Sequence, residues 1–282
     1  MDTLEVVRSI LSGINDVSRD EIEQLTGMIR DHYRESPNVI EIPHQNIIFV
    51  GDLHGEFNSI ASVQKLITKY PTHNFLFLGD YADRGPSQIE TFNLVMALTL
   101  KYPDRIQMLR GNHESDEVAQ RYGFYSEVTR KFSFEVYSKY LEVFQVLPMA
   151  AFSPDNIFAC HGGIPEGVSS IEEIQKCDRH DLNFPDNTLF QIVWNDPKEA
   201  DFGFAANSRG YKVKSFGHTA FQEFSNNVGF KLMFRAHEVF PDGYKTFFGD
   251  KLYSVFSAAY RGASIPTVLR LGGSFAVDPI RL

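Results

Sequence analysis

The chain has 282 residues, of which 43% are hydrophobic and 22% charged, so it is a globular protein rather than a disordered or fibrous one. Its net charge of −9 argues against nucleic acid as a partner, because that partner is bound through Lys and Arg. Its first residues do not read as a secretory signal, and the sequence shows no run of roughly 20 apolar residues and no CxxC pair. We therefore expect no membrane partner and a cytoplasmic location, or a nuclear one in a eukaryote.

The chain begins with a helical pattern. Residues 4–30 carry apolar side chains at helical spacing, and Gly13 and Asn15 divide the pattern into two short amphipathic helices. We expect residues 1–36 to form a helical segment packed on a single catalytic domain of residues 37–282.

Short, fully apolar runs then predict buried strands at Ile47–Val50, Phe75–Leu78, Ile106–Leu109, Ile157–Cys160 and Leu232–Phe234. Helical patterns over 57–70 and 87–102 join the first three strands, which predicts a right-handed, mostly parallel βαβαβ unit. Residues 179–190 read as a loop. The last fifty residues predict strands at Tyr244–Phe248, Leu252–Phe256 and Val268–Leu271. The fold class is therefore α/β, with a β-rich second half.

Each of the five apolar runs ends in a turn rich in polar groups. These turns are Gly51-Asp-Leu-His-Gly55, Gly79-Asp-Tyr-Ala-Asp-Arg-Gly85, Arg110-Gly-Asn-His-Glu114, His161-Gly-Gly163 and Arg235-Ala-His-Glu238. Ligands of open α/β sheets bind beyond the carboxyl ends of the strands. We therefore expect the five turns to meet at one edge and to form one site.

The ligand types in these turns predict a pair of metal ions. Three Asp, four His and one Asn supply oxygen and imidazole donors without thiolate, a set that suits Mn, Fe or Zn. Two ions about 3.5–4 Å apart, sharing a carboxylate, would use the whole set and support phosphoryl displacement. A single Gly-Asp-x-His turn is more often structural, but five such turns would bury many ionisable groups at a cost of several kcal/mol each.

These motifs resemble the PPP family of metal-dependent serine/threonine phosphatases, which includes the type-1, type-2A and calcineurin catalytic subunits. The three signature blocks of that family correspond to residues 51–55, 79–85 and 110–114, in the family's order. The resemblance covers roughly residues 20–275. Further similar stretches are Tyr122-Gly-Phe-Tyr125, Leu147-Pro-Met-Ala150, Trp194-Asn-Asp-Pro197, Asn207-Ser-Arg-Gly210 and Phe256-Ser-Ala258.

The resemblance implies a metallophosphoesterase fold, in which a central β-sandwich flanked by helices gives an α+β-type four-layer arrangement with the metals at one edge. It also implies two divalent or trivalent transition-metal ions, with Mn as the first choice and Fe or Zn as alternatives. Asp52, His54 and Asp80 would hold one ion. The other ion would share Asp80, and its remaining ligands would be Asn112, His161 and His237.

The resemblance also implies the chemistry. A hydroxide bridging the metals would attack phosphoserine or phosphothreonine directly, and His113, oriented by Asp83, would protonate the leaving oxygen. Arg84 and Arg209 would hold the phosphoryl oxygens together with Asn112, beside Tyr260. Tyr122 and Trp194 would line the substrate groove, although aromatic side chains serve equally as packing.

Two alternative functions remain. A diadenosine-polyphosphate hydrolase, or another small-molecule phosphoesterase, shares the first three blocks and is the second candidate; an inactive phosphatase-like scaffold is the third.

The partners would be phosphoprotein substrates and unidentified regulatory subunits. The chain ends at Leu282 without a long helical extension, so no calcium-sensor subunit is expected. The loop Ser257-Ala-Ala-Tyr-Arg-Gly262 also lacks the cysteine that the type-1 and type-2A enzymes carry there.

Overall fold

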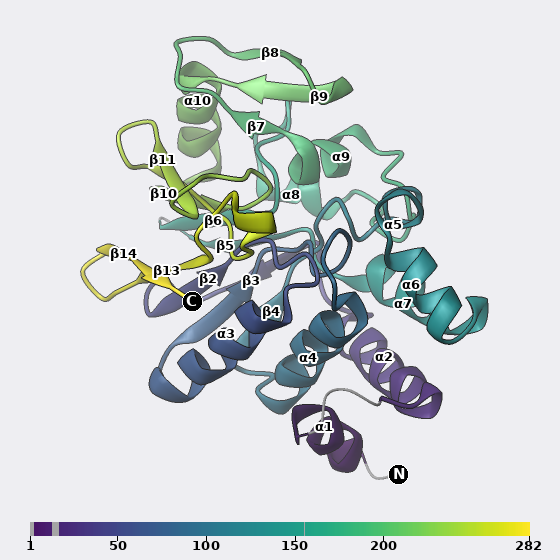
Figure 1. Cartoon of the computed structure of the whole chain (residues 1–282). Coiled ribbons are helices and arrows are strands. Elements are labelled where there is room, and N and C mark those ends of the chain that lie inside the picture. The colour runs from purple at the N-terminus through teal and green to yellow at the C-terminus, as the bar shows by residue number, and fades with distance from the viewer. Residues whose placement is uncertain (1–2, 13–16, 155) are drawn as a thin grey trace.

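The computed structural model describes residues 3–12, 17–154 and 156–282. It stacks four layers, with helices outside and two β-sheets packed face to face inside (Figure 1). In Figure 1 the helices α2 (Arg19–Tyr33), α3 (Phe57–Lys69) and α4 (Gln88–Lys101) lie below the sheets. The helices α8 (Ile171–Gln175), α9 (Asn187–Trp194) and α10 (His218–Val228) lie above them. The predicted α/β class and the helix-flanked sandwich are confirmed.

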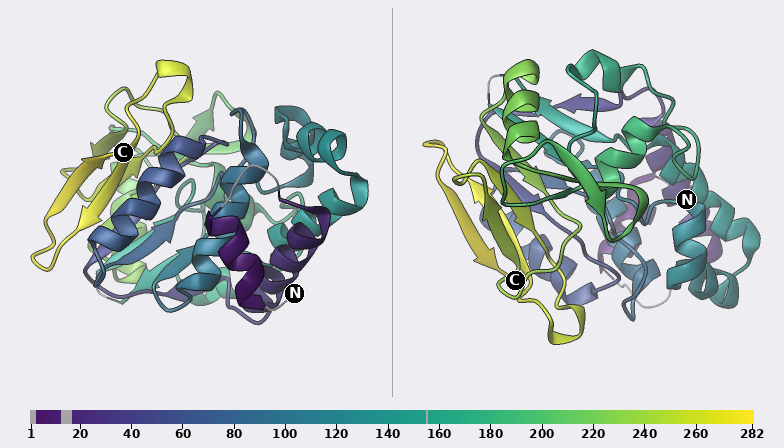
Figure 2. Two further views of the ribbon diagram at one scale, coloured as in Figure 1. Left: turned by 60° about the horizontal axis from the view of Figure 1, so that its bottom comes forward. Right: turned by 90° about the horizontal axis from the view of Figure 1, so that it is seen from above.

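The first two helices form as the apolar spacing predicts. They are α1 (Thr3–Ser12) and α2 (Arg19–Tyr33), and the predicted separators Gly13 and Asn15 lie outside the described residues. A capping box between Ser18 and Glu21 fixes the start of α2. Both helices pack against α4 (Gln88–Lys101) and share its core, as the left view of Figure 2 shows. The division of the chain at residue 36 stays a prediction.

The first sheet has five strands and contains the predicted βαβαβ unit. Strands β2, β3 and β4 run parallel, and α3 (Phe57–Lys69) and α4 join them. Two antiparallel strands extend this sheet beyond β2. The strand order is β14 (Val277–Arg281), β13 (Thr267–Leu271), β2 (Ile47–Val50), β3 (Asn74–Phe77) and β4 (Ile106–Met108).

The second sheet has six strands and mixed directions. Its order is β1 (Val39–Glu41), β5 (Ala150–Ser153), β6 (Ile157–Cys160), β10 (Leu232–Arg235), β12 (Leu252–Val255) and β11 (Tyr244–Phe247). The five strands with polar turns are thus divided between the sheets, since β2, β3 and β4 lie in the first while β6 and β10 lie in the second. Their turns meet at an edge of the sandwich rather than at the edge of one sheet.

Smaller elements surround the sandwich. A three-stranded sheet is formed by β7 (Asp196–Pro197), β9 (Gly210–Phe216) and β8 (Phe204–Asn207), in that order. The predicted loop ends earlier than residue 190, because Asp186 caps a helix that begins at Asn187. The remaining helices are α5 (Asp116–Tyr122), α6 (Phe124–Lys131), α7 (Phe134–Val146), α8 (Ile171–Gln175), α9 (Asn187–Trp194), α10 (His218–Val228) and the 3-10 turn η1 (Tyr260–Gly262).

The central strands are apolar throughout because both of their faces are buried. On β2, Ile48 and Val50 face the helices, while Ile47 and Phe49 face the other sheet. Between the sheets, Phe49 stacks on Phe234 with ring centroids 3.8 Å apart. This packing fixes the two sheets against each other, and so fixes the strand ends that carry the polar turns. Over the described part of the chain, no helix is long and apolar enough to cross a membrane.

Candidate active site

The two sheets touch at the edge where the polar turns lie. Asp52, directly after β2, forms a parallel bridge with Phe256, directly after β12. The backbones approach so closely that a Cβ atom on Gly51 would lie 2.2 Å from the carbonyl oxygen of Val255. Only glycine fits there. Gly51 therefore permits the contact that brings turns of different sheets to one place.

Several turn residues adopt backbone conformations that glycine usually takes. Positive φ angles occur at His54 (44°), Asp80 (58°) and His237 (70°), and also at Asp83 (65°) and Arg84 (69°). Such a conformation costs roughly 1–2 kcal/mol for a side chain with a Cβ atom. Concentration of strained residues at one place is typical of functional sites, where the side chain must point in a set direction.

The carboxylate of Asp80 lies at the centre of the site and is almost completely buried. Its Oδ2 atom lies 3.3 Å from Nε2 of His161, 3.7 Å from Nε2 of His54 and 3.9 Å from Nε2 of His113. Burial alone would raise the pKa of Asp80, but the rings of His161 and His113 hold it well below its ordinary value. Asp80 is thus a charged oxygen donor shared by three imidazoles.

The atoms around His161 suit a positive charge among them. Nδ1 of His161 faces the carbonyl oxygen of Leu78 at 2.9 Å and donates to it, which leaves Nε2 of the neutral ring with a lone pair. Nε2 then faces Asn112 Oδ1 at 2.8 Å, His237 Nδ1 at 3.2 Å and Asp80 Oδ2 at 3.3 Å. The amide oxygen only accepts, and so does an ionised carboxylate. A proton on the ring or a metal ion between these atoms would satisfy these acceptors.

His54 and Asp52 lie on the same buried edge. Nδ1 of His54 donates to the carbonyl oxygen of Ala82 (2.9 Å), so Nε2 points inward, 3.5 Å from Oδ2 of Asp52. Burial lowers the pKa of His54, but Asp52 and Asp80 outweigh that effect and raise it to about 9. The ring is thus placed where it stabilises, and is stabilised by, the negative charge of the cluster.

His237 has a different environment. Its backbone N–H donates to Oδ1 of Asp52 (2.8 Å), which ties the turn after β10 to the turn after β2. Burial, and then the charge of Arg209, hold the pKa of His237 well below its ordinary value. The neutral ring suits a metal ligand. Its Nε2 atom is buried and has no hydrogen-bond partner among the described residues.

Two groups of donors could each hold a metal ion, and they share Asp80. One consists of His54, Asp80 and His113, and the other of Asp80, His161 and His237; within each group the ligand atoms lie within 4.8 Å of one another. The donor set therefore fits two transition-metal ions bridged by a carboxylate. The sequence predicts Asp52 rather than His113 in the first group.

His113 differs from the other histidines in its second partner. Nδ1 of His113 lies 2.6 Å from the carboxylate of Asp83, and the other Asp83 oxygen accepts the backbone N–H of Phe124 (2.9 Å). His54 and His161 instead donate to neutral carbonyl oxygens. A charged acceptor is the better partner for a ring that must carry a proton at Nε2.

The cluster opens into a cavity of about 490 Å³. The side chains predicted to bind substrate line it together with five of the six predicted metal ligands; His161 is completely buried behind them. Arg84 stacks on Tyr122, with its Cζ atom 4.4 Å from the ring centroid, and donates to the hydroxyl of Tyr260 (2.5 Å). The predicted substrate-binding residues at this cavity are Arg84, Asn112, Arg209, Tyr260, Tyr122 and Trp194.

Trp194 contacts His237 edge-on, with ring centroids 5.4 Å apart, so it both packs and lines the cavity. Arg209 reaches the cavity from the turn between β8 and β9. Its Nε atom donates to Oδ2 of Asp196 (2.7 Å). The structure thus brings every predicted site residue to one edge of the sandwich, as cavity lining or, for His161 and Asp83, directly behind it.

Three buried charged residues position the site, and none of them has a role predicted from the sequence. Glu114 accepts the backbone N–H groups of Asp80 (2.8 Å), Tyr81 (3.0 Å) and Gly111 (2.8 Å), and so ties the turns after β3 and β4 together. Burial, and then Asp80, raise the pKa of Glu114 to about 7. Asp196 holds both Arg209 and the buried Arg235. Glu114, Asp196 and Arg235 each lie inside one of the motifs named above. No other feature of the sequence marks them.

Comparison with known proteins shows similarity over most of the chain. Residues 45–241 match the calcineurin-like phosphoesterase family. The chain is 38% identical to a protein phosphatase 2A catalytic subunit of Dictyostelium discoideum, over 84% of this chain and 76% of that protein. It is 34% identical to a PP2A-like serine/threonine-protein phosphatase of Candida albicans, over 89% of this chain but only 61% of that longer relative.

Solved structures show the same fold. A protein serine/threonine phosphatase from Saccharomyces cerevisiae with similarity to human phosphatase PP5 matches with a TM-score of 0.88 and 25% identity, over 99% of this chain and 96% of that chain. A cold-active protein-tyrosine phosphatase of Shewanella matches with a TM-score of 0.65 and 16% identity, over 89% of this chain and 84% of that chain. The second likeness concerns the fold alone.

Proposed function

The chain belongs to the calcineurin-like phosphoesterase family, as its motifs predict, and on that basis we propose that it is a serine/threonine protein phosphatase. The observation that carries the proposal is the shared position of Asp80 between two groups of metal donors. The relatives named as serine/threonine phosphatases support the substrate class. The metallophosphoesterase fold expected from the sequence is confirmed by the family match.

Six side chains are proposed to hold the metals. Asp80 would be shared by both ions, Asp52 and His54 would complete one site, and Asn112, His161 and His237 would complete the other. When bound, such ions lower the pKa of water from 15.7 to about 7 and draw charge from the phosphoryl oxygens. The buried carbonyl partners of His54 and His161 occupy Nδ1 of each ring and so leave Nε2 free to hold a metal ion.

His113 is proposed as the general acid, because its Nε2 atom faces the cavity while Asp83 holds Nδ1. A serine or threonine alkoxide is a poor leaving group, so a proton supplied at that oxygen raises the rate by about 10²–10⁴-fold. The Nη2 atom of Arg84 lies 3.4 Å from Nε2 of His113. The acid and an arginine can therefore contact one phosphate at the same time.

Arg84 and Arg209 are proposed to bind the phosphoryl oxygens. A guanidinium contacts phosphate through two parallel N–H groups, which fixes the orientation of the phosphate as well as its charge. Tyr122 and Tyr260 hold the guanidinium of Arg84 from two directions. The carboxylate of Asp196 holds Arg209 by accepting a hydrogen bond from its Nε atom. Both arginines are therefore oriented before substrate binds.

We propose Mn as the resident metal, with Fe and Zn as alternatives, because these ions accept mixed oxygen and imidazole ligands. The substrates are phosphoproteins, with regulatory subunits yet to be identified. We also propose that the protein works in the cytoplasm, since both of its cysteines, Cys160 and Cys177, are free thiols.

The substrate class can be tested with two compounds. A phosphoserine peptide should be turned over with a larger kcat/KM than diadenosine tetraphosphate, and both rates should fall to background after chelation. Preference for the dinucleotide would move the chain to the small-molecule phosphoesterases. Absence of turnover of both compounds, and of an aryl phosphate, in the metal-loaded protein would indicate a scaffold that only binds.

A further inference from the structure

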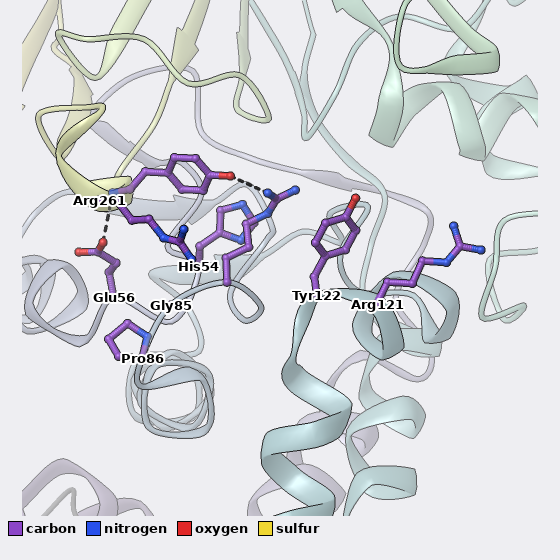
Figure 3. A pocket seen from close by; sticks show the side chains of 9 residues that line it. His54, Glu56, Gly85, Pro86, Arg121, Tyr122 and Arg261 are labelled. Atoms are coloured by element: carbon purple, nitrogen blue, oxygen red, sulfur yellow. Dashed lines mark hydrogen bonds between the residues drawn. The ribbon is translucent and has the colours of Figure 1, made fainter.

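A second cavity of about 600 Å³ continues from the site and is unusually rich in arginine (Figure 3). It shares His54, Arg84, Arg121, Tyr122 and Tyr260 with the catalytic cavity, so one bound molecule could occupy both. Arg261 also lines it, and Figure 3 shows Arg121 and Arg261 on opposite sides of the pocket. The lining therefore contains three arginines.

The negative charge in this lining is small. Glu56 is its only carboxylate among the described residues, and one of its oxygens already accepts the backbone N–H of Tyr260 (3.1 Å). The whole protein carries a net charge of −9, so a positive groove is contrary to the overall sign. Such a local field attracts an anionic partner to this face.

The guanidinium groups of Arg121 and Arg261 have no partner within the described part of the protein. Both residues are exposed, and neither guanidinium forms a hydrogen bond or an ion pair with another residue that the structure describes. Arg110 and Arg235, by contrast, are completely buried and donate their N–H groups to protein oxygens. The donors of Arg121 and Arg261 are therefore available to a ligand.

The backbone that carries Arg261 is strained. Tyr260 and Arg261 have φ angles of 47° and 57°, in the left-handed region that favours glycine. The turn places the ring of Tyr260 and the guanidinium of Arg261 over the same pocket. Strain of this kind persists where a side chain must be held in a particular direction. On the opposite side of the pocket, Arg121 lies on helix α5.

We propose that this groove selects phosphoprotein substrates with acidic side chains on both sides of the phosphorylated residue, through Arg121 and Arg261. The inference rests on the proposed function, since it requires phosphate bound at Arg84. Each exposed arginine should favour a carboxylate by about two- to fivefold. The two contacts together should give a preference of about five- to twentyfold over neutral flanks.

The test compares phosphoserine peptides that differ only in their flanks, acidic, neutral or basic. The wild-type kcat/KM should be largest for the acidic peptide, through KM rather than kcat, and the preference should shrink in 1 M salt, where screening acts within about 3 Å. Arg121→Gln and Arg261→Gln should each reduce the preference, and the double variant should abolish it. Arg121→Lys and Arg261→Lys should retain most of it.

Arg130→Gln provides the matched control, because Arg130 is exposed on α6 and lines neither cavity. An unchanged preference in the double variant, or equal kcat/KM for acidic and neutral peptides, would overturn the inference while leaving the phosphatase intact.

Binding of non-hydrolysable phosphonate analogues of these peptides, followed by fluorescence anisotropy, tests the groove separately from the reaction. Tighter binding of the acidic peptide supports the inference even without turnover. Equal binding of the acidic and the neutral peptide contradicts it, and so does a bound peptide that only diadenosine tetraphosphate displaces.

Discussion

The floor and the rim of the site are built in opposite ways. On the floor, Asp52, Asp80 and Asn112 are each 1% exposed, and His161 is completely buried. On the rim, Arg84, Arg121 and Arg261 are exposed, and so is Tyr122, at 44%. Floor groups are fixed by backbone turns and by one another, whereas rim groups are held by stacking or are free. This difference supports the proposed division, in which the floor carries out the chemistry and the rim selects the substrate.

The largest loss of activity is expected on the floor, at Asp80, the residue that both metal groups share. Asp80→Asn should lower kcat/KM by more than about 10⁴-fold, because the bridging charge is lost from both sites. Metal content should fall below two ions per chain by elemental analysis. Asp250→Asn, at an exposed turn between β11 and β12, is the matched control and should change neither quantity. A variant with full metal and full activity would contradict the role of Asp80.

His113 lies on the floor but is proposed to act on the leaving group. His113→Asn should keep both metals and lower kcat on a phosphoserine peptide by about 10²–10⁴-fold. The loss should be smaller on an aryl phosphate, whose leaving oxygen needs no proton. Rates measured over a series of leaving groups would show the difference. Equal losses across the series would argue that His113 is a metal ligand instead, as its distance from Asp80 allows.

On the rim, Arg84→Lys keeps the charge and removes the planar fork. We expect kcat/KM for the phosphoserine peptide to fall about tenfold, because lysine cannot contact phosphate through two parallel N–H groups or stack equally well on Tyr122. Inhibition by inorganic phosphate should weaken by a similar factor. Wild-type inhibition in this variant would place the phosphate elsewhere.

Tyr260→Phe, also on the rim, should have the smallest effect on activity. It removes only the hydroxyl that accepts from Arg84, and a single exposed hydrogen bond of that kind corresponds to roughly a two- to tenfold change. The change should appear in KM for the peptide, with metal content unaltered. A loss as large as that of Arg84→Lys would show that the hydroxyl contacts the substrate itself.

The fold was predictable where strands are buried on both faces. Ile47–Val50 and Ile157–Cys160 are apolar at every position, so their runs mark them at the correct residues. Sequence could not locate β8 and β9, whose residues are mostly exposed or half-buried, or β14, an edge strand interrupted by Pro279. The division of strands between two sheets was also hidden, since it depends on contacts such as that between Phe49 and Phe234.

The candidate site was predictable because its residues directly follow such strands. Asp52, Asp80 and Asn112 could be placed at one edge by their position alone. The supporting residues could not. Asp196 follows helix α9 and becomes relevant only when β9 brings Arg209 beside it. Arg121 gives no periodic or motif signal, and its position over the pocket depends on where α5 packs.

All of the proposed chemistry requires that side chains from separate strand ends hold two adjacent metal ions. Elemental analysis of protein purified without added metal, combined with phosphatase assays before and after chelation, measures whether they do. We predict about two transition-metal ions per chain, loss of activity when they are removed, and recovery when Mn is returned. Fully active protein with fewer than one ion per chain would show that the reaction does not depend on a metal pair.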